Sequence, residues 1–270
     1  MNIMKESLDL DKKSFLKKFE KIQDGFYQKL QDYIKNPNDE NIHDIRVAIR
    51  RLEIAHKILP KNVREKEKNT NHVKQAKTLF KLNAKIRDYD IICAKMESKY
   101  QDQTYDLITI LKNSRIEKLH SANEIALKIL QASTPKISAN MIKESKLNKR
   151  YFKVLGKIEL NIQKNTIIAL GDEKKIEELH MLRKDFKKLR YSFELASNKG
   201  KTVKILKDLK EIQDMLGDIH DNDIIIDHLR SIEQNSKYLG IIESEVLERS
   251  RKYHAFVTVF KKRRPKTGYF

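Results

Sequence analysis

Four potential cations lie along one side of the segment 39–59, which has the apolar rhythm of a helix. Because a helix turns about 100° per residue, these cations fall within a sector of roughly 60°: His43, Arg46, Arg50 and Lys57. Apolar side chains border the row on both sides, whereas an ordinary solvated helix face is a broad sector opposite one apolar stripe. This row, the first basic lane, therefore predicts cations that line a groove between packed helices.

The segment 173–198 repeats this design in the second half of the chain. Its matching row, the second basic lane, again has apolar neighbours on both flanks and consists of His180, Arg183, Lys187 and Arg190. Beside the lanes, Arg51 in the first half and Lys188 in the second half extend the basic patch.

A third row of cations is expected on the helix that follows the first basic lane. Its members recur at spacings of 3, 4 and 4 residues and share one helix face: Lys74, Lys77, Lys81 and Lys85. Like charges at such spacings destabilise a helix by about 0.2–0.5 kcal/mol per pair. In the second half Lys207 and Lys210 hold the first two corresponding positions, while aspartates hold the other two.

Cations gathered in one cleft repel one another, and their arrangement becomes favourable when a polyanion enters. Phosphate oxygens suit arginine, which binds them with two parallel hydrogen bonds, and lysine, which acts as a point charge. A nearby anion also raises the pKa of a histidine, so the two lane histidines are candidate additional cations. For each histidine taken alone, the alternative is a neutral packing residue with one hydrogen bond.

The whole chain is strongly basic, with a formal net charge of +19 at pH 7 over 270 residues. Solubility does not need such a charge, which predicts attraction to a polyanion or an anionic surface. A lysine-rich proteome would also produce many surface lysines. The functional interpretation is favoured because the cations of the lanes are arranged in ordered rows.

The elements that position these residues are expected to be helices alone. The chain has only 7 glycines and 4 prolines, too few for the many turns of a β-sandwich or barrel. The sequence NPND at 36–39 ends one helix and offers an asparagine or aspartate cap to the next. Periodicity predicts helices at about 8–35, 39–59, 66–87, 89–131, 145–170, 173–198, 201–217 and 222–262. We expect the last helix of each half to be interrupted, near 100 in the first half and near 235–240 in the second.

The chain contains an internal repeat. The sequence HDIRVAIRRL at 43–52 aligns with HMLRKDFKKLR at 180–190, at an offset of 137 residues. Further along, KIRDYDII at 85–92 aligns with DIHDNDII at 218–225, at an offset of 133 residues. Two matched pairs in the same order indicate two homologous halves.

We place these halves at 1–135 and 136–270. The segment ASTPKISAN at 132–140 has the composition of a linker between them. Short loops favour antiparallel neighbours, so each half is expected to be a four-helix bundle.

The pattern His-x-x-Arg-x-x-x-(Arg/Lys)-(Arg/Lys)-Leu, given twice, resembles the CHAD family, the histidine-containing α-helical domains. The segment LGDIHDNDIIIDHL at 216–229 is similar to that family's second-half signature. The resemblance implies a single CHAD-like domain over 1–270, with two four-helix bundles related by pseudo-twofold symmetry and basic helices lining a central cavity. It also implies non-catalytic binding of inorganic polyphosphate. The ligand-facing candidates that carry over are His43, Arg46, Arg50, Arg51, His180, Arg183, Lys187, Lys188 and Arg190.

The chain departs from the family pattern at two places. Glu53 stands at the position that matches Arg190, where the family often has a base. Asn83-Ala84 stands where the second half has Leu216-Gly217, so we expect the two halves to differ locally.

The leading hypothesis is therefore a protein that binds inorganic polyphosphate. We expect binding to weaken steeply with salt and to strengthen as the pH falls toward the histidine range. The alternative is a sequence-nonspecific nucleic-acid-binding helical protein, for which KKRRPK at 261–266 would supply a contact. The lanes show little of the aromatic interleaving that base stacking uses, so nucleic acid is expected only as a weaker competitor.

Neither a catalytic site nor a cofactor is expected, although an enzyme acting on polyphosphate or nucleotides is a third hypothesis. The sequence shows no nucleophile–base pair and no glycine-rich phosphate loop. HDND at 220–223 is a candidate metal site, but its first-half counterpart at 87–90 contains no histidine, so we expect no metal. Asp88 and Asp221 are expected instead to cap the final helix of each half.

The sequence predicts a cytoplasmic protein. The single Cys93 excludes an internal disulfide and fits a reducing compartment. The first residues lack an apolar signal core, and no apolar run approaches the ~20 residues of a membrane span, so we expect no membrane insertion. Association with polyphosphate granules, a regulatory role and a targeting role are all left open.

Overall fold

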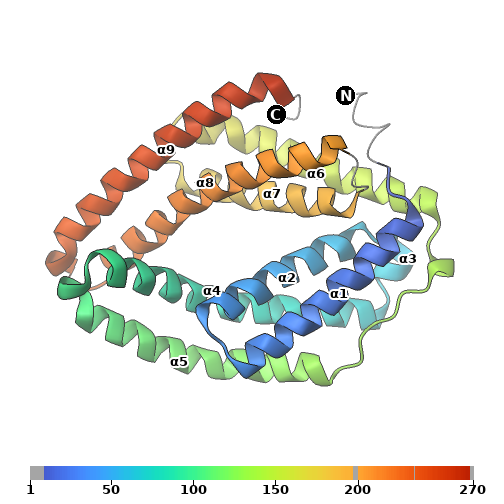
Figure 1. Cartoon of the computed structure of the whole chain (residues 1–270), viewed down its shortest axis with the longest axis horizontal. Coiled ribbons are helices and arrows are strands. Elements are labelled where there is room, and N and C mark those ends of the chain that lie inside the picture. Colours follow the sequence, from blue (N-terminus) through green and yellow to red (C-terminus); the bar gives the residue numbers. More distant parts are fainter. Residues whose placement is uncertain (1–8, 197–199, 234, 268–270) are drawn as a thin grey trace. The chain divides into compact units, whose positions relative to one another are not determined.

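The computed structural model describes residues 9–196, 200–233 and 235–267. Within these ranges every regular element is a helix, as Figure 1 shows, and the expected all-α class is confirmed. Among the described residues, no helix combines the length and the low charge that crossing a bilayer requires.

The helices follow one another along the chain with short connections. They are α1 (Lys12–Lys35), α2 (Asp39–Ile58), α3 (Lys61–Arg64), α4 (Glu67–Lys99), α5 (Gln101–Gln131), the 3₁₀ helix η1 (Ala139–Met141), α6 (Glu144–Ala169), α7 (Ile176–Leu195), α8 (Gly200–Arg230), the 3₁₀ helix η2 (Asn235–Tyr238) and α9 (Leu239–Thr267).

The start of α2, the helix of the first basic lane, follows from its sequence. The side chain of Asn38 accepts a hydrogen bond from the backbone N–H of Asn41 at 2.8 Å, which satisfies one of the unpaired donors of the first turn. Asp39 and Glu40 lie in that turn, where the helix dipole favours negative charge. The expected cap within NPND is therefore confirmed.

Two expected helix ends are wrong. Asp88 and Asp221 lie inside α4 and α8 and do not cap the helices that follow, because α4 continues to Lys99 and α8 continues to Arg230. The buried face of α4 extends past residue 87 through Tyr89, Cys93 and Met96, so packing holds the longer helix together. The last helices accordingly begin at 101 and 239, at the interruptions that the sequence did indicate.

The chain divides into two compact units. Unit 1 holds the described residues up to Val154 together with Leu195 and Ala196. Unit 2 holds Leu155–Glu194 and the described residues from 200 to 267. Each basic lane therefore lies almost wholly within one unit, and each is described within its own unit.

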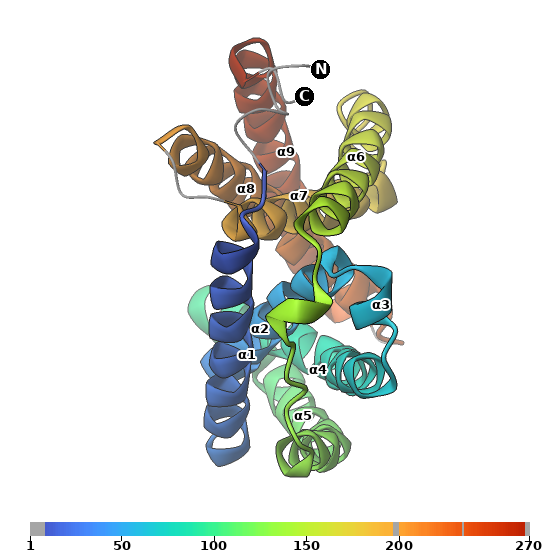
Figure 2. The ribbon, with the colours of Figure 1, turned by 90° about the vertical axis from the view of Figure 1, so that its right-hand side faces the viewer.

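In unit 1 the helices α1, α2, α4 and α5 pack around a common core (Figure 2). Helix α2 contacts both α1 and α4, and α5 contacts both α1 and α4. Fully buried side chains of this core include Phe26 on α1, Ile45 and Ile49 on α2, Leu79 on α4 and Ile129 on α5. The apolar face of the first lane helix is thus buried as its periodicity predicts.

In unit 2, α8 packs on α9, and aromatic residues join further helices. Phe186 on α7 meets Phe260 on α9 with ring centroids 6.0 Å apart. The hydroxyl of Tyr253 on α9 donates a hydrogen bond to the carbonyl of Ala169 at the end of α6, at 2.9 Å. These contacts fix α7, the helix of the second basic lane, against its neighbours.

Candidate anion-binding surfaces

Two guanidinium groups of the first basic lane lie against the same aromatic ring. The ζ carbon of Arg46 lies 4.2 Å from the ring centroid of Phe80 on α4, and that of Arg50 lies 4.8 Å from it. Arg46 Nη1 also donates a hydrogen bond to the carbonyl oxygen of Phe80 at 2.7 Å. Because guanidinium groups stack on aromatic faces, the ring holds two like charges close together in a fixed orientation. We call Arg46, Arg50 and Phe80 the Phe80 platform.

The other cations predicted in the first half lie on α2 and α4. His43 is exposed on α2, whereas Arg51 and Lys57 are half-buried there. The predicted row on α4 is exposed along its whole length, at Lys74, Lys77, Lys81 and Lys85. These lysines can therefore meet a ligand in solvent.

One carboxylate interrupts the basic surface of the first half. Glu53 on α2 lies 3.9 Å from the ammonium group of Lys77 on α4. This partner of the row on α4 comes from the helix packed beside it. The ammonium group of Lys77 is exposed while Glu53 is half-buried, and at 3.9 Å the pair leaves most of the charge of Lys77 open to a ligand.

In the second half, the lane histidine meets another histidine. His180 Nδ1 on α7 lies 3.3 Å from His220 Nδ1 on α8, so one ring nitrogen donates a proton and the other accepts it. Burial, together with the positive charges of Arg183 and Lys187, lowers the pKa of His220 to about 2. His220 is therefore neutral, and the lane cations surround it.

The remaining cations of the second half have varied surroundings. Arg183 lies over Gly217 of α8, since a Cβ atom at Gly217 would be 4.0 Å from Arg183 Nε. Lys188 pairs with buried Asp185 at 2.6 Å, and Arg190 pairs with Glu194 at 3.4 Å. These partners reduce the charge that either cation offers to a ligand.

On α8, Lys207 and Lys210 are both exposed. Their side chains are accessible to solvent, as those of the lysines on α4 are.

Sequence reasoning missed two residues of these surfaces. Phe80 stands between Lys77 and Lys81 in the sequence, and its position inside a row of lysines was the available signal. His220 was considered only as a metal ligand, although it faces the lane histidine.

A buried ion pair recurs at matched positions of the two halves. Arg115 Nε on α5 donates to Asp90 Oδ1 on α4 at 2.7 Å, and Arg249 Nε on α9 donates to Asp223 Oδ1 on α8. Burial raises the pKa of both carboxyl groups, and the arginine partner opposes that change in each case. The sequence matched the two aspartates but did not reveal these partners.

Within the ranges that the structure describes, no cluster of three or more histidine, cysteine or acidic side chains could hold a metal ion. The Cys93 thiol is buried, and burial raises its pKa to about 11. The thiol is therefore protonated and poorly suited to bind a metal.

Comparison with known proteins gives the family. The model of the CHAD domain family matches residues 20–230. The chain belongs to the CHAD domain family. The crystal structure of the CHAD domain from the plant Ricinus communis is similar in fold, with a TM-score of 0.61 at 17% identity over 97% of this chain and 91% of that one. No curated protein matched the chain.

Proposed function

We propose that this CHAD domain binds inorganic polyphosphate through the cations of its two basic lanes, without catalysis. The observation that carries the proposal is the Phe80 platform, in which two guanidinium groups are oriented side by side on one ring. Each guanidinium can bind phosphate oxygens through two hydrogen bonds. A chain of phosphates supplies such oxygens at regular intervals.

The physical basis is that folding holds the lane cations close together before any ligand binds, so that they repel one another. Arg46 is already held by the ring and by the carbonyl of Phe80, so little side-chain freedom is lost when an anion arrives. The exposed lysines of α4 add positive potential along the same helix pair. A polyanion that enters releases its counterions and relieves the repulsion.

We further propose that the two halves share one four-helix plan by internal repetition. The matched ion pairs Asp90–Arg115 and Asp223–Arg249 support this, because each joins the two last long helices of its half. The central cavity that the family resemblance implies stays a prediction.

The decisive measurement is a calorimetric titration with long-chain polyphosphate, alongside single-stranded DNA and RNA of equal charge. Replacing Arg46, Arg50, Arg183 and Lys187 with alanine should weaken polyphosphate binding by about 100-fold or more at low salt. The matched control removes four exposed lysines elsewhere, Lys17, Lys21, Lys118 and Lys128, and should stay within about 5-fold of the parent because distant charges are screened. Circular dichroism checks that helicity is unchanged.

Two results would reject the proposal. Equal losses in both variants would mean that only net charge matters, and tighter binding of RNA or DNA that polyphosphate cannot displace would favour the nucleic-acid alternative. A phosphate-release assay with divalent metals tests the non-catalytic part, for which we expect no turnover.

A further inference from the structure

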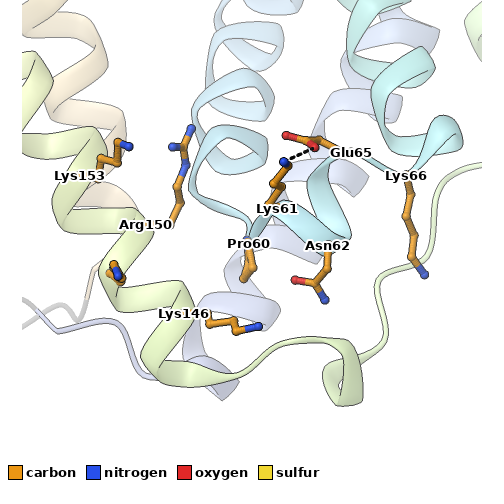
Figure 3. A pocket seen from close by; sticks show the side chains of 9 residues that line it. Pro60, Lys61, Asn62, Glu65, Lys66, Lys146, Arg150 and Lys153 are labelled. Atoms are coloured by element: carbon orange, nitrogen blue, oxygen red, sulfur yellow. Dashed lines mark ion pairs between the residues drawn. The ribbon is translucent and has the colours of Figure 1, made fainter.

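Unit 1 contains a second basic surface, apart from the lanes. It is a pocket of about 620 Å³ between α3 with its flanking residues and the first half of α6. Figure 3 shows Pro60 between the two walls, with Lys61 and Lys66 on one side and Lys146 and Lys153 on the other. This volume falls within the range of sites that hold small molecules.

The lining of this pocket is strongly positive. It carries one carboxylate, Glu65, which is already paired with Arg64 at 2.9 Å and with Lys61 at 3.7 Å. Against it stand six cations: Lys61, Lys66, Lys146, Lys149, Arg150 and Lys153. Four of them come from a single face of α6, at helical spacings that bring like charges together at an energetic cost.

Arg150 is a fixed member of this lining. Its Nε donates a hydrogen bond to the carbonyl oxygen of Lys57 at the end of α2, at 2.9 Å. Burial lowers the pKa of Arg150, and the positive charge of Arg64 lowers it further. An anion in the pocket would offset both effects, because it stabilises the charged guanidinium.

The shape and chemistry of the lining indicate the class of ligand. Cations on two facing walls can bind a small molecule whose phosphate groups project in different directions. The lining contains no aromatic side chain, so it offers no surface on which a nucleotide base could stack. Pro60 and the lysine stems instead supply aliphatic carbon surface.

We propose that this pocket binds a compact ligand with several phosphate groups on a small aliphatic ring, the class of the cyclitol polyphosphates. The pocket lining shares no residue with the basic lanes, although Arg150 donates to the backbone of Lys57, and the proposal does not depend on polyphosphate binding at the lanes. A ligand bound at this place would contact both the segment that follows α2 and the first half of α6.

The test is calorimetric titration of the full chain with myo-inositol hexakisphosphate. Replacing Lys146, Lys149 and Lys153 with alanine should weaken binding at least 10-fold. The matched control removes Lys17, Lys21 and Lys118, which are equally exposed, and should change binding less than 3-fold. A second variant, Asn62→Glu, adds a carboxylate to the opposite wall and should weaken binding at least 3-fold even if the triple variant folds poorly.

The same variants separate this pocket from the lanes. Arg46→Ala/Arg50→Ala should leave hexakisphosphate binding within 3-fold while it weakens binding of long-chain polyphosphate. If the lane variant instead abolishes hexakisphosphate binding, or if the two lysine triples lose affinity equally, the pocket is not the site. Tighter binding of ATP than of the hexakisphosphate would overturn the ligand class. If the lane variant loses polyphosphate binding but keeps hexakisphosphate binding, the result supports a hexakisphosphate site in the pocket.

Discussion

The two halves surround their matched lane cations in different ways. In the first half, the guanidinium groups of Arg46 and Arg50 rest on Phe80, and Arg46 donates from α2 to a carbonyl of α4. In the second half, Gln213 stands at the position that matches Phe80, and it donates from α8 to the carbonyl of Phe186 on α7 at 3.0 Å. In both halves a hydrogen bond therefore joins the lane helix to the next long helix. The lane helix is the donor in the first half and the acceptor in the second. The lane sequence sets which cations are present, and the neighbouring helix sets how rigidly they are held.

The lane histidines also have different surroundings in the two halves. His43 is exposed, whereas His180 contacts the ring of His220 with centroids 4.3 Å apart. The residue that matches His220 in the first half is Arg87, so the second half replaces a cation by a neutral ring. The first half thus offers the denser charge, and the second half offers the more buried surroundings.

The comparison is tested most strongly by breaking the buried ion pair that recurs in both halves. Arg115→Ala and Arg249→Ala each leave a buried carboxylate without its partner, and each should lower the free energy of unfolding by about 3 kcal/mol. The aspartate side chains are only 5% and 6% exposed, so water cannot replace the lost partner. Urea unfolding followed by circular dichroism measures both changes.

The control for this prediction is Lys29→Ala, which removes a partly exposed pair with Asp44 and should cost under about 1 kcal/mol. A large loss for one arginine variant and none for the other would show that the halves are not braced alike.

Acid should destabilise both halves, but over different pH ranges. Burial, together with the nearby charge of Arg64, lowers the pKa of His56 to about 4, and the pKa of His220 is lowered to about 2. Both histidines are neutral in the folded protein, whereas in the unfolded chain they bind a proton below a pKa of about 6.5. The free energy of unfolding is therefore unaffected by these groups above about pH 6.5 and decreases as the pH falls below that value, because the unfolded chain binds more protons. The slope is at most about 1.4 kcal/mol per pH unit for each histidine.

Urea unfolding at pH 7, 6, 5, 4 and 3 checks this expectation. His56→Gln and His220→Gln should each flatten the dependence of unfolding free energy on pH, and only the loss from His220 should continue below pH 4. The exposed His120 is the control, and His120→Gln should leave the slope unchanged. An unchanged slope in the two buried variants would contradict the assignment.

A smaller effect is expected from removing the aromatic ring alone. Phe80→Leu keeps every charge but loses the stacking of two guanidinium groups, worth about 1 kcal/mol in all. Polyphosphate affinity should therefore fall about 5-fold. Gln213→Leu, at the matching position, should change affinity less than 2-fold, and equal losses would show that the ring has no special role. Calorimetry at fixed salt measures both.

The smallest expected effect concerns the carboxylates beside the lanes. Glu53→Gln removes the partner of Lys77 and should raise polyphosphate affinity about 2-fold, as expected for a pair 3.9 Å apart near the surface. Glu194→Gln, beside Arg190, tests the same point in the second half. If affinity falls in either variant, the carboxylate orients its cation for the ligand and does not compete with it.

Much of the fold could be predicted because its signals are local. The scarcity of glycine and proline predicted the all-α class, and the cap at Asn38 placed the start of α2 correctly. The helix ends near 87 and 217 were wrong because an aspartate that caps a helix and one that pairs inside it look alike in sequence. Asp90 shows the difficulty, since its partner Arg115 lies 25 residues away on another helix.

The candidate site was predictable only in part. The spacing of Arg46 and Arg50 on one side of a helix was visible, because helical geometry fixes which residues share a face. Their contact with Phe80 was not, because it depends on how α2 and α4 pack side by side. The basic pocket at α6 could not be predicted for the same reason, since its two walls are at least 80 residues apart in the sequence.

Arg115 joins three segments through a single side chain. Its Nε reaches Asp90 on α4, while its Nη2 donates to the carbonyl oxygen of Pro37, just before α2, at 2.6 Å. A lysine has one terminal nitrogen and cannot serve two such separated acceptors together. During divergence of the family, we expect any loss of arginine here to coincide with a remodelled connection at 36–38, so that the two sites change in step.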